Sequence, residues 1–120
     1  MAEAMPGEGN IPFELDGKDM ELVPTLQACM TISRIAGGLN AAVQRCLQLD
    51  FDTIEQIVTA GLALNPTQAR KVGEAIYKTG LIALSAPCID FINVVANGGK
   101  PLPEDDEEDG EADQGPRVPA

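Results

Sequence analysis

Residues 11–36 read IPFELDGKDMELVPTLQACMTISRIA, and the spacing of apolar residues changes within this stretch. In its first half, apolar and polar residues alternate on both sides of Asp16-Gly17. An Asp-Gly pair between two alternating runs is a strong signal for a two-residue hairpin turn. The sequence therefore predicts a short two-stranded β-hairpin at the start of the folded part.

From Pro24-Thr25 onward, apolar residues recur every three to four positions, which is the period of an amphipathic helix. The pattern ends at Gly37-Gly38, and glycine is favoured where a helix terminates in a left-handed conformation. We therefore predict a helix over residues 25–36. Because a two-stranded hairpin is only marginally stable alone, its apolar face is expected to pack against the helices that follow.

Three more helices are predicted in the middle of the chain. Asn40 is a suitable N-cap for a short second helix, and Asp52 with Glu55 has the spacing of a capping box for a third. Asn65-Pro66 predicts the start of a fourth helix, since proline fits the first helical position, where its missing N–H has no partner anyway. Gly80 is placed to end that helix with a left-handed cap.

The last ordered segment, residues 81–95, is apolar on almost every side. A helix of this kind either lies in the middle of the domain or offers a surface to another chain. Pro87 is expected to kink or restart it, because proline removes one backbone hydrogen bond and clashes with the preceding turn. If the helix binds a partner, the residues expected to do so are Leu81, Leu84, Ile89, Phe91, Ile92 and Val95.

The chain changes character at Gly98-Gly99-Lys100-Pro101. Residues 101–120 contain eight acidic residues and one basic residue, so they contribute −7 to the net charge of −11. Such a segment cannot bury enough apolar surface to offset the entropy of ordering it, and its like charges repel. We therefore predict a disordered acidic tail. Its candidate electrostatic residues are Glu104, Asp105, Asp106, Glu107, Glu108, Asp109, Glu111 and Asp113.

These patterns divide the 120 residues into three segments. We predict a flexible N-terminus over residues 1–10, a helical domain with an N-terminal β-hairpin over residues 11–97, and the disordered acidic tail over residues 98–120. A chain of this length has room for one domain. The predicted fold class is mainly α, with four to five short helices preceded by the hairpin.

The residue types most used in catalysis and metal binding are scarce. The chain has no histidine, which removes the usual general base and the commonest transition-metal ligand. Cys29, Cys46 and Cys88 are odd in number and widely spaced, so they indicate neither a disulfide framework nor a zinc site, and we interpret them as small core residues. We predict a protein that is not an enzyme, with no catalytic residue, cofactor or metal.

Composition also bears on partners and location. The only adjacent basic pair is Arg70-Lys71, with no aromatic platform beside it, which argues against direct binding of nucleic acid. The sequence shows neither a secretory leader nor a run of eighteen apolar residues, so we expect no membrane association and a cytosolic location.

Several short motifs occur in a recognisable order: FELDGK at residues 13–18, Pro24-Thr25, Gly37-Gly38, Asp52-Thr53-Ile54, Gly61-Leu62 and Asn65-Pro66. An apolar final helix follows them. This order resembles the small tail assembly chaperones of tailed phages, the group related to the gene transfer agent tail protein. The resemblance covers residues 11–97.

The resemblance implies a non-enzymatic role in building a phage tail. Such a chaperone would hold the long, helical tape measure protein in the host cytoplasm, bring major tail tube subunits to it, and be absent from the mature virion. A homo-oligomer is possible. Two alternatives stay open: a structural tail protein of the tube or connector, a class usually dominated by long β-hairpins, and an acidic inhibitor of a host nucleic-acid-binding protein.

Overall fold

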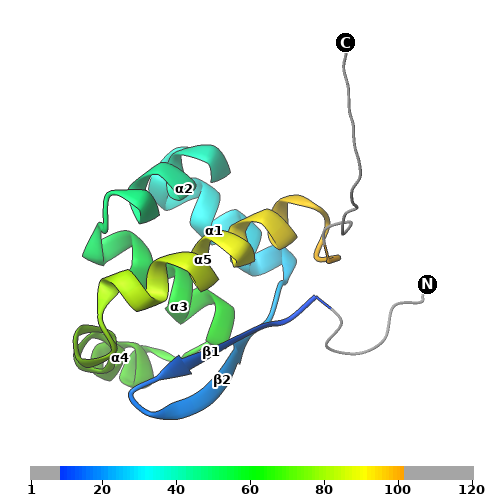
Figure 1. The fold of residues 1–120 in the computed structure, drawn as a ribbon. Helices are drawn as coiled ribbons and strands as arrows, with labels where there is room; N and C mark the ends of the chain where they lie inside the picture. Colours follow the sequence, from blue (N-terminus) through cyan, green and yellow to red (C-terminus); the bar gives the residue numbers. More distant parts are fainter. Residues whose placement is uncertain (1–8, 102–120) are drawn as a thin grey trace, which may run out of the picture.

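A computed structural model describes residues 9–101 as a β-hairpin packed against five helices (Figure 1). The elements are β1 (Ile11–Leu15), β2 (Lys18–Leu22), α1 (Leu26–Ala36), α2 (Leu39–Leu47), α3 (Phe51–Leu62), α4 (Pro66–Thr79) and α5 (Leu81–Ala96). The predicted fold class is confirmed in these residues. The predicted flexible N-terminus lies mostly outside the described range, and so do all the acidic tail residues from Glu104 to Asp113.

The hairpin forms where the sequence places it. Asp16 and Gly17 both have positive φ, at 53° and 81°, which is the conformation of a type I′ turn. Leu15 and Leu22 point inward and are buried. The backbone N–H of Asp16 donates to the hydroxyl of Thr79 over 2.7 Å, so the turn is tied to the end of α4.

The predicted start of α4 is confirmed. Asn65 is the N-cap, its side chain accepts from the backbone N–H of Gln68 over 2.8 Å, and the Gln68 side chain accepts from the N–H of Asn65 over 3.0 Å. Pro66 occupies the first helical position. This reciprocal capping satisfies two amides that have no partner within the helix.

The predicted N-caps of α2 and α3 are each wrong by two residues. Gly38, rather than Asn40, is the N-cap of α2, because Gly37 and Gly38 both have positive φ and complete the turn between the helices. Asp50, rather than Asp52, caps α3. Leu49 has a φ of 58°, so the chain reverses there and Asp50 is the first residue able to cap.

The junction between α4 and α5 also differs in detail from the prediction. Gly80 has φ 100° and ψ 134°, so it is not in the left-handed helical conformation. It is shared as the cap of both helices and has to redirect the chain. Beyond it, α5 runs unbroken from Leu81 to Ala96 with Pro87 inside, so the predicted restart does not occur.

The lengths of these helices bear on membrane crossing. Within residues 9–101, no single helix is both long and apolar enough to span a bilayer. The pair α4 and α5 reaches that length and hydropathy together, but the two helices are bent by 117° at their junction.

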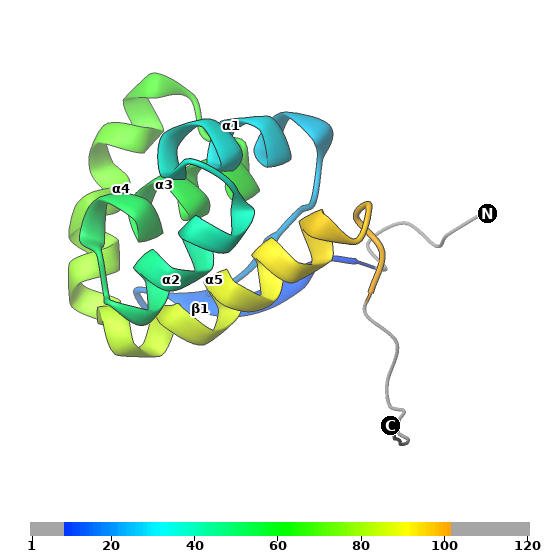
Figure 2. The same cartoon turned by 90° about the horizontal axis from the view of Figure 1, so that it is seen from above.

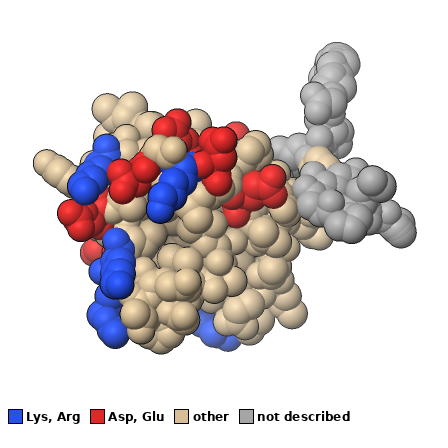
Figure 3. Space-filling view, turned by 90° about the horizontal axis from the view of Figure 1, so that it is seen from below, with Lys and Arg blue, Asp and Glu red and all other residues tan. Residues whose placement is uncertain are grey.

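Charged side chains are unevenly distributed over the surface. Glu14, Asp19 and Glu21 are exposed on the hairpin. Figure 3 views the molecule from the hairpin side and shows acidic side chains, with basic ones among them, on the upper part of this face, above a wide and mostly uncharged area. Residues 56–69 and 79–89 contain no charged residue, so these two segments add no charge to the surface.

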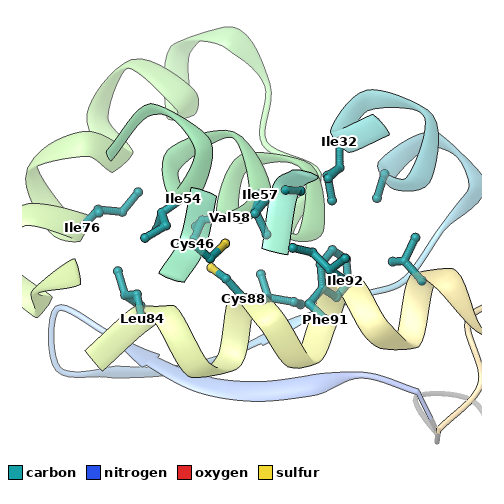
Figure 4. Close-up of a cluster of buried hydrophobic side chains, with 14 of the residues drawn as sticks. Ile32, Cys46, Ile54, Ile57, Val58, Ile76, Leu84, Cys88, Phe91 and Ile92 are labelled. Carbon is teal, nitrogen blue, oxygen red and sulfur yellow. The ribbon is translucent and has the colours of Figure 1, made fainter. Parts of the chain in front are cut away.

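The core is organised around α5. This helix contacts all four other helices and β1, and it crosses the body of the domain in two perpendicular views (Figures 1 and 2). Its inward side chains meet those of α3 and α4, including Ile54, Ile57 and Ile76, which are fully buried (Figure 4). Of the two roles considered for α5, the structure therefore shows the central core helix.

Candidate functional site

Four of the six residues predicted to bind a partner are core residues in this structure. Leu84, Phe91, Ile92 and Val95 are all buried, and a partner would have to open the core to reach them. Leu81 and Ile89 are half-buried at its margin. Of the six predicted residues, only Leu81 and Ile89 therefore reach the surface.

The apolar side chains that are exposed were not among those predicted. Ile82 is 80% exposed, Tyr77 78%, Leu26 75% and Leu47 59%. Sequence periodicity does not identify Ile82, because its neighbours in α5 are apolar in every direction. The only available signal for Leu47 is its position as the last apolar residue before the end of α2.

Two of these exposed residues lie where the end of α2 meets the start of α5. The hydroxyl of Ser85 donates to the carbonyl oxygen of Cys46 over 3.2 Å, which joins the two helices at this point. Leu47 follows Cys46 directly, and Ile82 and Ile89 lie about one helical turn on either side of Ser85. We define the α2–α5 surface as Val43, Leu47, Leu49, Ile82 and Ile89.

The α2–α5 surface contains both exposed side chains and half-buried ones. Leu47, Leu49 and Ile82 are exposed, whereas Val43 and Ile89 are half-buried and packed against the core. No charged residue occurs from position 79 to Ile89. Exposed apolar side chains over a rigid base are typical of protein-binding surfaces.

The opposite end of α5 fixes where the acidic tail begins. The N–H of Gly99 donates to the carbonyl of Val94 over 2.9 Å, and the N–H of Gly98 to that of Val95 over 3.2 Å, which is a Schellman-type helix end. At 1.5 Å rise per residue, this end lies roughly 20 Å along α5 from Ile82. This end of α5 is therefore far from Ile82 but only about 10 Å along the helix from Ile89.

The two buried thiols have low chemical reactivity. Cys46 and Cys88 are buried, and their side chains extend toward each other between α2 and α5 (Figure 4). Burial, with a smaller contribution from Asp50, raises the pKa of Cys46 to about 11. Burial raises the pKa of Cys88 as well. Since the thiolate is the reactive form, both are poor nucleophiles at neutral pH, and their interpretation as core residues is confirmed.

Asp50 is an acidic residue whose side-chain pKa is shifted by the fold. Its carboxylate accepts hydrogen bonds from the hydroxyl of Thr53 and from the N–H of Thr53, the latter over 3.2 Å. The hydroxyl hydrogen bond is the main cause that lowers the pKa of Asp50 below its ordinary value of 3.8. The backbone N–H and Arg45 act in the same direction, and desolvation opposes them.

This lowered pKa predicts a specific pH dependence of stability. Because the folded pKa of Asp50 lies below the unfolded one, its ionised form stabilises the fold above about pH 4, and this contribution is lost as the pH falls through the folded pKa. Asp50→Asn is therefore expected to be less stable than wild type at pH 7, with a difference that shrinks as the pH falls below about 4. Urea denaturation of both proteins from pH 7 to pH 3 measures it.

The control for this prediction removes the main cause of the pKa change. In a Thr53→Val background, which lacks the hydroxyl, the loss of stability caused by Asp50→Asn is expected to be smaller at every pH. A loss that stays constant with pH, or one that the Thr53 change leaves unaltered, would contradict the assignment.

Within residues 9–101, no group of three or more His, Cys, Asp or Glu side chains is arranged to hold a metal ion. Comparison with known protein families, curated proteins and solved structures gives no match to this chain. A functional proposal therefore depends on the motif order in the sequence and on the surfaces described above.

Proposed function

We propose that this chain is a tail assembly chaperone of a tailed phage, which binds the tape measure protein and recruits tail tube subunits without enzymatic activity. The observation that carries the proposal is the α2–α5 surface, where Leu47 and Ile82 are exposed on a helical domain. The order of sequence motifs over residues 11–97 supports the same proposal. The chaperone would act in the host cytoplasm and be absent from the mature virion.

The proposed binding mode is a client helix laid along the α2–α5 surface. An amphipathic helix presents apolar side chains at positions i, i+3, i+4 and i+7, and these suit an apolar surface formed by two helices. Burying one Leu or Ile side chain contributes about 1.5–3 kcal/mol. Leu47 and Ile82 together would contribute about 3–6 kcal/mol, so a micromolar affinity also needs contacts made by Val43, Leu49 and Ile89.

The strand content favours this proposal over a tube subunit. Residues 9–101 contain two strands of five residues each, whereas tube subunits are expected to be built mainly from long hairpins. The acidic tail fits recruitment, because a dense run of carboxylates attracts basic patches on a partner with fast, salt-sensitive association. It would also keep client-loaded complexes apart by mutual repulsion.

The direct test is co-expression of the chain with the tape measure and tube proteins of the same phage. We expect the tape measure protein to become soluble and to co-purify. The double variant Leu47→Asp with Ile82→Asp is expected to weaken that binding at least roughly tenfold, which corresponds to losing about 1.4 kcal/mol or more. Affinity is measured with a purified helical segment of the client by isothermal titration calorimetry.

Tyr77→Asp is the matched control. Tyr77 is about as exposed as Ile82 but lies on α4, outside the α2–α5 surface, so its replacement should leave client binding unchanged. Equal binding by the double variant and wild type would refute the proposed surface. Stoichiometric incorporation of the chain into the tube wall of finished particles would refute the proposed function and favour the structural alternative.

A further inference from the structure

A groove lies between β1 and α5, on the hairpin side of the molecule. The groove has a volume of about 620 Å³. One wall is β1, the other is formed by Ala83, Ala86 and Pro87 of α5, and Lys78 with Thr79 lines the end at α4. Because two wall residues are alanines, this face of α5 leaves room beside the strand.

The wall formed by β1 is an unpaired sheet edge. Among residues 9–101 the sheet has two strands, so within this part of the chain β1 pairs with β2 on one side alone. A two-residue turn is closed by a hydrogen-bonded pair, here Leu15 with Lys18, and bonded and non-bonded pairs then alternate along the strand. The alternation directs the backbone groups of Glu14 and Pro12 away from β2, and both residues line the groove.

The backbone groups in the groove are mainly hydrogen-bond acceptors. Pro12 has no N–H, so it offers only its carbonyl, whereas Glu14 offers both a carbonyl and an N–H. On the other wall, Pro87 also lacks an N–H, which deprives the carbonyl of Ala83 of its usual donor four residues along the helix. A ligand rich in donors therefore matches these groups better than one rich in acceptors.

The charges of the groove point to the same kind of ligand. Glu14, Asp16 and Asp90 line it, against one basic residue, Lys78. The Nζ atom of Lys78 lies 3.5 Å from the Oε2 atom of Glu74, so the carboxylate of Glu74 offsets part of the positive charge of Lys78. Ile11 and Phe13, which are half-buried, add apolar surface to the β1 wall.

We propose that this groove binds an extended, basic segment of a partner protein, which adds a third strand to β1. Backbone hydrogen bonds along a sheet edge supply affinity in this mode, and alternate side chains supply specificity. The inference goes beyond the proposed chaperone function, since it uses a different surface and holds for any partner of this chemistry. A second copy of this chain is a poorer occupant, because pairing two β1 strands would bring their Glu14 and Asp16 carboxylates together.

The test is titration of the ¹⁵N-labelled full chain with a synthetic peptide of alternating lysine and valine, followed by NMR. We expect the amide signal of Glu14 to shift on binding and to exchange more slowly with solvent. A peptide of alternating glutamate and valine is expected to bind at least tenfold more weakly. Raising the salt concentration from 50 to 300 mM is expected to weaken binding of the lysine peptide, because exposed charges are screened.

A backbone-modified peptide distinguishes strand addition from simple charge attraction. N-methylation of every second residue of the lysine peptide removes the donors on one edge and keeps every charge. We expect this change to weaken binding roughly 5- to 30-fold, the effect of losing one or two net hydrogen bonds. Equal binding of the methylated peptide would overturn strand addition.

Two exposed carboxylates of the groove provide the protein variants. The double variant Glu14→Gln with Asp90→Asn is expected to bind the lysine peptide several-fold more weakly than wild type. The matched control is Asp19→Asn, because Asp19 pairs with Glu14 across the hairpin but does not line the groove. These changes should leave client binding through the α2–α5 surface unaltered, so the two proposals fail independently.

Three outcomes would overturn the inference. They are no binding of the lysine peptide at millimolar concentration, shifts confined to the α2–α5 surface, and a concentration-dependent dimer that protects the Glu14 amide without peptide. Analytical ultracentrifugation detects the last of these.

Discussion

Replacing Phe91 with alanine is expected to lower the free energy of unfolding by about 3–5 kcal/mol, the typical cost of truncating a buried aromatic side chain. Phe91 is 0% exposed and lies on α5, the helix that contacts every other helix and β1. A domain of this size has a total stability of about 5–14 kcal/mol. The variant is therefore expected to lose a large share of its stability, and to be only marginally folded if the total is at the low end.

Urea denaturation followed by helical circular dichroism measures this loss, which suits a chain without tryptophan. Two control variants provide the comparison for this loss of stability. Phe91→Leu retains most of the apolar volume and is expected to cost much less, whereas Ile82→Ala, at an 80% exposed site on the same helix, should change stability by less than about 0.5 kcal/mol. A cost for Phe91→Ala as small as that for Ile82→Ala would show that α5 is not the centre of the core.

The parts of this fold that were predictable from sequence are those specified by local chemistry. Asp16-Gly17 requires a tight turn, and Asn65-Pro66 offers a cap and a first helical residue, so the hairpin and α4 were predicted correctly. The start of α2 was not, because its cap is Gly38, which has no side chain to signal a cap, and the start of α3 was not, because Asp50 and Asp52 could each serve. The chain reversal at Leu49, which decides in favour of Asp50, has no sequence signal of its own.

The candidate surfaces were less predictable because they depend on contacts between distant segments. In α5, nearly every position is apolar, so the pattern could not separate buried Phe91 from exposed Ile82. The groove beside β1 exists because residues about seventy positions apart meet there. The effect of Pro87 on the carbonyl of Ala83 can be deduced from sequence, but the placement of both residues in the same groove as Glu14 cannot.

Gly61→Val is the second change expected to have a large effect, with a loss of about 3 kcal/mol in the free energy of unfolding. Gly61 is buried in α3, and a Cβ there would lie 2.6 Å from Cδ2 and 3.0 Å from Cβ of Leu22, which is itself 0% exposed. The N–H of Val23 donates to the carbonyl of Gly61 over 2.9 Å, so α3 and β2 are also joined at this point. Overpacking a closed core contact costs about 1–3 kcal/mol, and valine adds three carbons.

Gly73 on α4 provides a control of opposite sign. Both glycines are inside helices, where alanine is intrinsically favoured by about 0.8–1 kcal/mol. A Cβ at Gly73 would lie 2.9 Å from the Oε2 atom of Glu55, which is the far end of a flexible side chain and can move aside. Gly73→Ala is therefore expected to stabilise the protein by about 0.5–1 kcal/mol, while any side chain at Gly61 has to separate a helix from a strand. Chemical denaturation of both variants measures the contrast, and a stabilising Gly61→Val would mean that the hairpin is not held against α3 in solution.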